Sequence, residues 1–272
     1  MLSPEQTSGQ SQKNMELPPI TNYPLYVYRV FAKWLSFLYF GIGSLFIICI
    51  SFPIMRLRFR TREEFQRRGH ALVSSMWANF CLFLRFVGAA KTNVSDRPAF
   101  SNLKSKIIVA NHPSLLDVVM LIALIPNADC IVNASLTRTV VGNIVKRLYI
   151  LNSLEFDDLK AACLKTLEAG NCLIIFPEGS RTPRTGHLPL KRGAARLALM
   201  CGRPVVPVHI GGNDKWGLGK HDPLLAYNHT EEYVYSIQLG RELNTADYAG
   251  LPSPIAARRL TADIEKAIFC EN

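Results

Sequence analysis

Residues 106–117 read KIIVANHPSLLD, and this stretch decides how the rest of the chain is interpreted. Residues 106–110 are a short, mostly β-branched apolar run, which is typical of a buried strand. Residues 115–122 are again strongly apolar and are typical of a helix. His112 is therefore expected at a turn between a strand and a helix, where side chains at the end of a sheet are accessible to a ligand.

Asp117 lies five positions after His112, and a histidine beside a carboxylate is the usual pair for removing a proton near neutral pH. The carboxylate keeps one ring nitrogen protonated and leaves the other nitrogen free as a base. The same stretch also fits a capping sequence, with Ser114 as the N-cap and Asp117 at the third helical position. The two interpretations are compatible, because a carboxylate that caps a helix is held rigidly.

The composition limits the classes of partner. The 272 residues leave room for one sizeable α/β domain with an appendage. A net charge of +10 together with 49% hydrophobic residues points to nucleic acid or an anionic bilayer. Because there is no zinc-finger spacing and no basic-aromatic repeat, we expect an anionic phospholipid bilayer and no nucleic acid. The seven cysteines include no CxxC pair, which favours reduced thiols in a cytosol-facing protein.

Residues 23–90 are expected to anchor the protein in a membrane, after a disordered polar tail at residues 1–22. Residues 34–55 contain no charge, and their length suits a helix that crosses a hydrocarbon core of about 30 Å. A buried core helix rarely runs so far without a charge. The segment is also too long, and too far from the start, for a signal peptide.

The charges on the two sides of this segment are unequal. Arg29 and Lys33 precede it, whereas six arginines follow it, at positions 56, 58, 60, 62, 67 and 68. This excess predicts that the C-terminal side, and with it the catalytic domain, faces the cytoplasm. Pro53 with Gly41 and Gly43 would also allow a re-entrant hairpin, so spanning and monotopic insertion both stay open.

Residues 62–87 are expected to form a second, amphipathic helix with a broad apolar face and arginines toward its start. Such a helix suits the membrane interface, where its cations meet anionic head groups. The alternative is a helix that packs on the catalytic domain.

From residue 91 onward the sequence pattern changes and predicts alternating strands and helices. Strands are expected at residues 106–110, 129–132, 148–151, 172–176, 204–210 and 233–239. Helices are expected at residues 114–124, 137–147, 157–169, 191–201 and 253–269. This alternation predicts an α/β fold with a mixed, largely parallel sheet flanked by helices, whose ligand binds beyond the carboxyl ends of the strands.

A second group of polar residues follows the strand at residues 172–176. It begins with PEGSRT at residues 177–182, in which Pro177 and Gly179 shape a tight turn and Glu178 and Arg181 place opposite charges at the mouth of the site. Hydroxyls and cations follow, at Ser180, Thr182, Arg184, Lys191 and Arg192. Basic side chains around turn amides suit a phosphate monoester, although a surface loop that solvates its charges is the alternative.

Three motifs together carry a resemblance: NHPSLLD at 111–117, FPEGSRT at 176–182 and VPVHI at 206–210. Over about residues 91–239 the chain resembles the glycerolipid acyltransferases of the 1-acylglycerol-3-phosphate acyltransferase type. The resemblance implies that His112 is the general base and that Asp117 orients it. It implies that the acceptor's glycerol phosphate is bound by Phe176, Pro177, Glu178 and Gly179, with Arg181 close by. It also implies that residues 91–272 form a mixed α/β acyltransferase domain seated on the membrane by N-terminal helices.

One position departs from the family pattern. The family carries an arginine at the end of a strand between the two motifs and assigns it to the acceptor phosphate. In this chain Asn152 stands about there, and Arg138, Lys146 or Arg147 are the candidates to replace it. The departure bears on the acceptor rather than on the reaction class.

The expected reaction moves a fatty acyl group from acyl-CoA or acyl-carrier protein to the hydroxyl of a lysophospholipid, with 1-acyl-sn-glycerol-3-phosphate as first choice. His112 takes the hydroxyl proton, and backbone amides near Ser114 are candidates for stabilising the oxyanion. No cofactor or metal is expected, since the thioester is already activated and the other histidines lack ligand spacing.

Three alternatives stay open. In the first, the protein is an acyltransferase for another acceptor, which is glycerol-3-phosphate, another lysophospholipid or a specialised lipid. In the second, it is a membrane protein that binds lipid or acyl carrier without catalysis. In the third, it is a serine hydrolase that uses Ser114. The last is disfavoured because the sequence has no GxSxG elbow.

Overall fold

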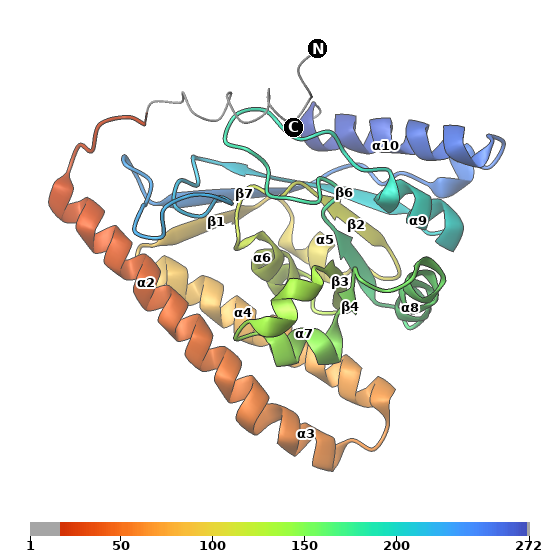
Figure 1. Ribbon diagram of the computed structural model, residues 1–272, viewed down its shortest axis with the longest axis horizontal. Coiled ribbons are helices and arrows are strands. Elements are labelled where there is room, and N and C mark those ends of the chain that lie inside the picture. Colours follow the sequence, from red (N-terminus) through yellow and green to blue (C-terminus); the bar gives the residue numbers. More distant parts are fainter. Residues whose placement is uncertain (1–16, 271–272) are drawn as a thin grey trace.

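The computed structural model describes residues 17–270, so most of the tail expected at residues 1–22 lies outside the described residues. Helices come first, and from residue 90 to residue 212 strands and helices alternate (Figure 1). The helices are α2 Tyr23–Phe46, α3 Phe52–Arg58, α4 Arg62–Phe86, α5 Arg97–Ser101, α6 Asp117–Leu124, α7 Gly142–Leu148, α8 Phe156–Glu168, α9 Gly193–Cys201 and α10 Ser253–Phe269. The strands are β1 Ala90–Val94, β2 Ile107–Ala110, β3 Ala128–Val132, β4 Ile150–Leu151, β5 Cys172–Ile175, β6 Val205–Gly212 and β7 Tyr233–Leu239. Short helical turns are η2 Ile47–Ser51, η3 Ala134–Arg138 and η4 Thr245–Tyr248.

The strands form one sheet in the order β1-β7-β6-β2-β5-β3-β4. Every neighbouring pair is parallel except β6 and β7, which are antiparallel. The expectation of a mixed, largely parallel α/β sheet is therefore confirmed. Strands β2 and β5 lie side by side near the middle of the sheet, so the segments that follow them leave the same edge.

Helices cover both faces of the sheet, because successive side chains of a buried strand point to opposite sides. In β2, Ile108 and Ala110 belong to the apolar core under α4, α6 and α7. Ile107 and Val109 belong to a second core under α8, α9 and α10. Figure 1 shows these two helical layers on either side of the sheet.

Several expected boundaries were wrong. The helix expected at residues 137–147 is divided into η3 and α7. The chain turns tightly between them, and a Cβ at Gly142 would lie 2.2 Å from the Thr137 carbonyl oxygen. The helix expected from residue 114 begins at Asp117. Strand β1 was not expected, because its sequence has no apolar run: only Ala90 of its five residues is buried.

The N-terminal helices form a long hairpin along one side of the α/β domain. The helical backbone continues from Tyr23 to Arg58 through α2, the π-helical turn η2 and α3, and the chain reverses at residues 59–61. Pro53 is accommodated in the first turn of α3, directly after that π-helical turn. Within the described residues, this is the one helix long and apolar enough to cross a membrane, judged by length and composition.

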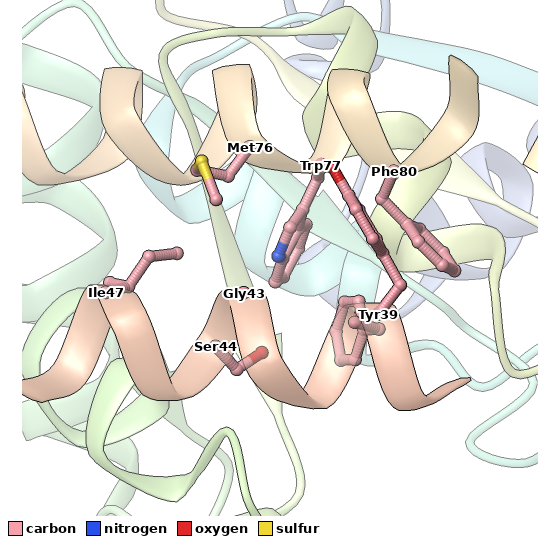
Figure 2. Close-up of a pocket in the computed structure, with 8 residues that line it drawn as sticks. Tyr39, Gly43, Ser44, Ile47, Met76, Trp77 and Phe80 are labelled. Atoms are coloured by element: carbon pink, nitrogen blue, oxygen red, sulfur yellow. The ribbon is translucent and has the colours of Figure 1, made fainter. Parts of the chain in front are cut away.

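Helix α4 returns between α2 and the sheet, where it packs on α6. Its inward face buries Val73, Trp77 and Phe80. For this face, the second of the two interpretations of residues 62–87, a helix packed on the domain that follows, is correct. Figure 2 shows how Trp77, Phe80 and Met76 of α4 meet Tyr39 and Gly43 of α2 and Ile47 of η2. Leu82 and Phe86 of α4 stay largely exposed, as do many apolar side chains of α2.

Candidate active site

The turn after β2 is fixed first by Asn111. Its amide nitrogen donates to the Ile210 carbonyl oxygen at 2.9 Å, and its side-chain oxygen accepts from the Ile210 N–H at 2.7 Å. These two bonds continue the pairing of β2 with β6 beyond the strand end. As a result, His112 is directed to the carboxyl edge of the sheet.

His112 and Asp117 lie in direct contact. The Nδ1 atom of His112 is 2.8 Å from Oδ2 of Asp117, whose side chain is completely buried. Because an ionised carboxylate only accepts hydrogen bonds, Nδ1 carries the hydrogen and Nε2 is left with a lone pair. The imidazole is 21% exposed, and Nε2 has no hydrogen-bond partner among residues 17–270. The pair thus has the arrangement of a general base held by a buried carboxylate.

Ser114 holds the other side of the carboxylate, and it is not the N-cap that the sequence suggested. Its hydroxyl donates to Asp117 Oδ1 at 2.6 Å, and its backbone N–H donates to Oδ2 at 2.7 Å. Helix α6 begins only at Asp117, with Leu116 in the N-cap position. Asp117 therefore receives hydrogen bonds on both oxygens, which fixes its orientation toward His112.

The amides near Ser114 do not fit the expected oxyanion-binding role. The N–H of Ser114 is committed to Asp117, that of Leu115 donates to the Leu218 carbonyl at 3.2 Å, and that of Leu116 donates to Ser114 Oγ at 3.1 Å. Each donor already has an acceptor, so the turn uses its amides to support the carboxylate.

The two sequence motifs meet in space. The Thr182 N–H donates to the His112 carbonyl oxygen at 2.7 Å, and the His112 N–H donates in return to Thr182 Oγ1 at 2.9 Å. The ring of Phe176 stacks on the imidazole, with centroids 4.3 Å apart and planes 26° from parallel. The turn that follows β5 thus supports the base directly.

Glu178 is a buried hydrogen-bond acceptor that connects three segments, and the expectation that its charge lies at the mouth of the site was wrong. Its side chain is buried, and its carboxylate accepts from the Thr182 hydroxyl, from the His112 N–H at 3.1 Å and from the Leu188 N–H at 3.3 Å. A carboxylate with three donors can be buried without a cationic partner. Pro177, also buried, accepts the Lys191 N–H at 2.9 Å through its carbonyl.

The exposed side of this turn is formed by Gly179 and Lys191. Gly179 has φ +68°, a conformation that favours glycine, and a Cβ there would lie 2.5 Å from Lys191 Nζ. The Lys191 ammonium group therefore lies directly over the turn. Ser180 is partly exposed and Arg192 is exposed, and among the described residues no hydrogen bond ties either side chain to His112.

Arg181 is turned toward a neighbouring loop. Its Nη1 donates to the carbonyls of Leu218, at 3.3 Å, and of Gly219. Partial burial lowers the pKa of the guanidinium, while the negative charges of Asp117 and Asp222 act in the opposite direction. Since Leu218 also accepts from Leu115, Arg181 fastens this loop against the base-bearing turn.

Two buried residues that sequence reasoning missed complete the surroundings. The Tyr235 hydroxyl of β7 lies 2.8 Å from Ser114 Oγ, which extends the chain of contacts from His112 through Asp117. Lys215 places its ammonium 4.6 Å from the centre of the Tyr235 ring, and burial lowers the pKa of Lys215 to about 8. No local sequence signal marks Tyr235, because its partner is 121 positions away.

Asn152 and its possible substitutes lie in different places. Asn152 follows β4, and its side-chain oxygen accepts from the Ala134 N–H at 3.1 Å, so it holds the start of η3. Lys146 and Arg147 lie in the last turn of α7 and line a concavity shared with the N-terminal hairpin. Arg138, at the end of η3, is exposed. As for metals, no group of three or more His, Cys, Asp or Glu side chains suited to hold one occurs among residues 17–270.

Comparisons with known proteins point to acyltransferases. The family model described as Acyltransferase matches residues 91–211. A chloroplastic 1-acyl-sn-glycerol-3-phosphate acyltransferase of Brassica napus is 26% identical over 56% of this chain and 45% of its own length. The beta form of that enzyme from Homo sapiens is 26% identical over 52% of this chain and 55% of its own length. The chain spans about half the length of the curated relatives it matches.

The fold has a counterpart among solved structures. The crystal structure of the 1-acyl-sn-glycerophosphate acyltransferase PlsC from Thermotoga maritima has a TM-score of 0.64 to this chain. It is 18% identical and covers 90% of this chain and 99% of its own. The matched domain and the named relatives lead to one conclusion: residues 91–211 match the Acyltransferase family, and the chain is similar to 1-acyl-sn-glycerol-3-phosphate acyltransferases and shares the fold of PlsC.

Proposed function

We propose that the protein is a membrane-bound O-acyltransferase that moves a fatty acyl group from an acyl thioester to the hydroxyl of a lysophospholipid, with 1-acyl-sn-glycerol-3-phosphate as the preferred acceptor. The observation that carries the proposal is the contact of His112 with the buried Asp117, which leaves Nε2 of His112 free at the edge of the sheet. The relatives named above are acyltransferases for that acceptor.

In the proposed mechanism, His112 Nε2 accepts the proton of the acceptor hydroxyl as the hydroxyl oxygen attacks the thioester carbonyl. The Asp117 carboxylate stabilises the imidazolium that forms, and the proton then passes to the departing thiolate. General base catalysis of this kind contributes about a hundred- to ten-thousandfold in rate. No metal or cofactor is needed, since acyl-CoA or acyl-carrier protein supplies an activated acyl group as co-substrate.

The acceptor phosphate is proposed to bind at the exposed side of the turn at residues 176–182. Lys191 lies over Gly179, and Arg192 is exposed at the start of α9, so both cations are available to an anion. Ser180 adds a hydroxyl on the same turn. Arg181, Thr182 and Glu178 support this arrangement through the contacts described above.

Membrane association is proposed for the hairpin of α2, α3 and α4. The apolar helix Tyr23–Arg58 leaves many large apolar side chains exposed, among them Phe31, Leu38 and Ile42. The arginines after residue 55 are proposed to face the cytoplasm together with the catalytic domain. A bilayer that holds both enzyme and acceptor removes the need to extract a lipid into water.

A panel of acceptors tests the proposal. Purified full-length protein is given labelled acyl-CoA or acyl-carrier protein with lysophosphatidic acid, glycerol-3-phosphate and other lysophospholipids. We expect turnover with lysophosphatidic acid, and loss of turnover in His112→Ala with unchanged binding to vesicles. Turnover of a different acceptor alone would reject the preferred substrate, and undiminished activity of His112→Ala would remove His112 from the mechanism.

A second acceptor is favoured by one observation. Asn152 stands where the family pattern has an arginine, and its side chain is engaged with the backbone of Ala134. If the phosphate site lacks a cation there, an acceptor with a smaller or differently placed phosphate group is preferred. The same panel distinguishes this case, because Asn152→Arg would then raise activity toward lysophosphatidic acid.

A further inference from the structure

A strongly basic concavity lies where α3, the start of α4 and α7 come together. It is open to solvent and has a volume of about 680 Å³. None of its residues is among those described above around His112, although Lys146 and Arg147 were candidates to replace the family's arginine. Its positively charged lining residues are Arg56, Arg60, Arg62, Lys146 and Arg147.

These cations have no acidic counterpart within the lining of the concavity. The lining contains no Asp or Glu, and among residues 17–270 none of the five forms an ion pair. Glu63, next to Arg62 in the chain, is paired with Lys165 at 3.2 Å. Bringing five like charges to one concave surface is unfavourable by itself, and a concave wall focuses their field. The arrangement is therefore suited to an anion with several charges or several acceptor oxygens.

The surroundings of the cations are apolar, which suits an amphiphile better than a small ion. Phe59 and Phe65 lie in the wall of the concavity itself. On the adjoining helix, Ile54 is 59% exposed and Leu57 is 87% exposed. An anionic lipid presents the matching combination, a phosphate group directly beside acyl chains.

We propose that this concavity is a specific site for the phosphate of an anionic phospholipid headgroup. The inference rests on the proposed membrane association and goes beyond it, since it assigns one saturable site rather than diffuse attraction. The ligand is held from two parts of the fold. Arg56, Arg60 and Arg62 belong to the N-terminal hairpin, whereas Lys146 and Arg147 belong to the catalytic domain.

A bound headgroup would therefore connect the hairpin to α7. The two parts already touch there, since the Arg147 guanidinium lies 5.7 Å from the centre of the Phe52 ring and Gly69 of α4 packs on Leu148. Helix α7 leads directly into β4 and Asn152. The lipid is thus expected to fix the orientation of the catalytic domain relative to the membrane surface.

The test compares binding of the full-length chain to vesicles of pure phosphatidylcholine and to vesicles that also contain phosphatidylglycerol, which is neither substrate nor product of the proposed reaction. The double variant Lys146→Gln with Arg147→Gln removes two cations from the catalytic-domain side. Each basic side chain near an anionic surface is worth about fivefold in affinity, so the loss expected for phosphatidylglycerol vesicles is about twenty-fivefold. Binding to pure phosphatidylcholine should stay unchanged.

A matched control has the same change of charge elsewhere. Arg258→Gln with Arg259→Gln removes two exposed cations from α10, on the opposite face of the sheet, and is expected to retain the affinity of the parent protein. The pair Arg60→Gln with Arg62→Gln is a second variant that should reproduce the loss from the hairpin side. Melting temperatures of all variants confirm that they fold.

The outcomes separate this site from the proposed function. An equal loss in the α10 control would overturn the inference in favour of diffuse electrostatics. Binding of inorganic phosphate to the lipid-free protein, lost in the same variants and as tight as vesicle binding, would overturn the lipid assignment. Failure to bind either vesicle would overturn the membrane association itself. Failure of acyl transfer, by contrast, leaves these binding results unaffected.

Discussion

Nδ1 of His112 lies 2.8 Å from Oδ2 of Asp117, and the same oxygen accepts the backbone N–H of Ser114 at 2.7 Å. The carboxylate is therefore shared between the base and the turn that carries it. Substituting Asp117 with Asn keeps the shape but turns one oxygen into an amide group that faces donors. We expect kcat of Asp117→Asn to fall by about a thousandfold, because the histidine loses its preferred tautomer and its counter-charge.

The measurement is steady-state acyl transfer by Asp117→Asn beside His112→Ala. The double variant should be no slower than the slower single variant, since the two residues act as one unit. A fully additive loss would mean that Asp117 acts independently of His112.

Ser114 and Tyr235 are expected to be positioning residues for this pair. Ser114→Ala removes the donor to Asp117 Oδ1, and Tyr235→Phe removes the hydroxyl 2.8 Å from Ser114 Oγ. We expect kcat to fall about tenfold in Ser114→Ala and less in Tyr235→Phe, with KM for both substrates nearly unchanged. If Ser114→Ala abolished activity and a fluorophosphonate labelled Ser114 in the parent protein, Ser114 would instead be identified as a nucleophile.

Glu178 is expected to contribute mainly to stability. Its buried carboxylate accepts from Thr182, His112 and Leu188, and the neutral amide of Glu178→Gln can replace only one of its two oxygens. The free energy of unfolding should fall by about 1–3 kcal/mol, measured by denaturant titration. The exposed Glu155→Gln is the control and should leave stability unchanged. A rise in KM for the acceptor without loss of stability would favour direct contact with substrate.

Gly179 is expected to tolerate no side chain without cost. In Gly179→Ala the φ of +68° becomes unfavourable by about 1–2 kcal/mol, and the new methyl group displaces the Lys191 ammonium. KM for a phosphorylated acceptor should therefore rise severalfold while the acyl donor is unaffected. Gly193→Ala is a matched control, because a Cβ there meets nothing within 4 Å.

His70 predicts how stability depends on pH. It is buried on α4, its Nδ1 has no partner among the described residues, and burial lowers its pKa from 6.5 to about 4. Between these values the unfolded chain binds the additional proton and the folded protein does not. The free energy of unfolding should therefore decrease as the pH falls from 6.5 toward 4, by about 3 kcal/mol in total.

Denaturant titrations across this pH range test the expectation. In His70→Gln the decrease attributable to this residue should disappear, whereas the exposed His221→Gln should behave as the parent protein does. Parallel pH profiles of His70→Gln and the parent would show that His70 is not responsible.

Much of the sheet could be predicted from the sequence because its central strands are apolar on both faces. The runs at β2 and β5 have this character, and the segment at Ser253–Phe269 has a clear helical period that the structure reproduces. Strand β1 could not be recognised, since it pairs on one side only and alternates between buried and exposed residues. Propensity carries little information for such an edge strand.

In the candidate site, too, some residues could be predicted from the sequence and others could not. His112 and Asp117 were identifiable because both lie within one short motif, and the structure brings them into contact. Glu178 was recognised as part of the site but placed wrongly, because its burial depends on contacts with a different segment. Tyr235 and Lys215 gave no signal, since what matters about them is their distance from Asp117 in the folded chain.

Lys33 connects the N-terminal helix α2 to a loop that packs beside the candidate active site. Its ammonium group, on α2 and buried, donates to the carbonyls of Leu224, at 2.7 Å, and of Ala226, and the same loop carries the Leu218 carbonyl that accepts from Arg181 and Leu115. A truncated protein that starts after α2 would therefore lose the contact that holds this loop beside the His112 turn. Solubilising this protein for biochemical work will require exchanging the outward apolar side chains of the helix while the helix itself stays in place.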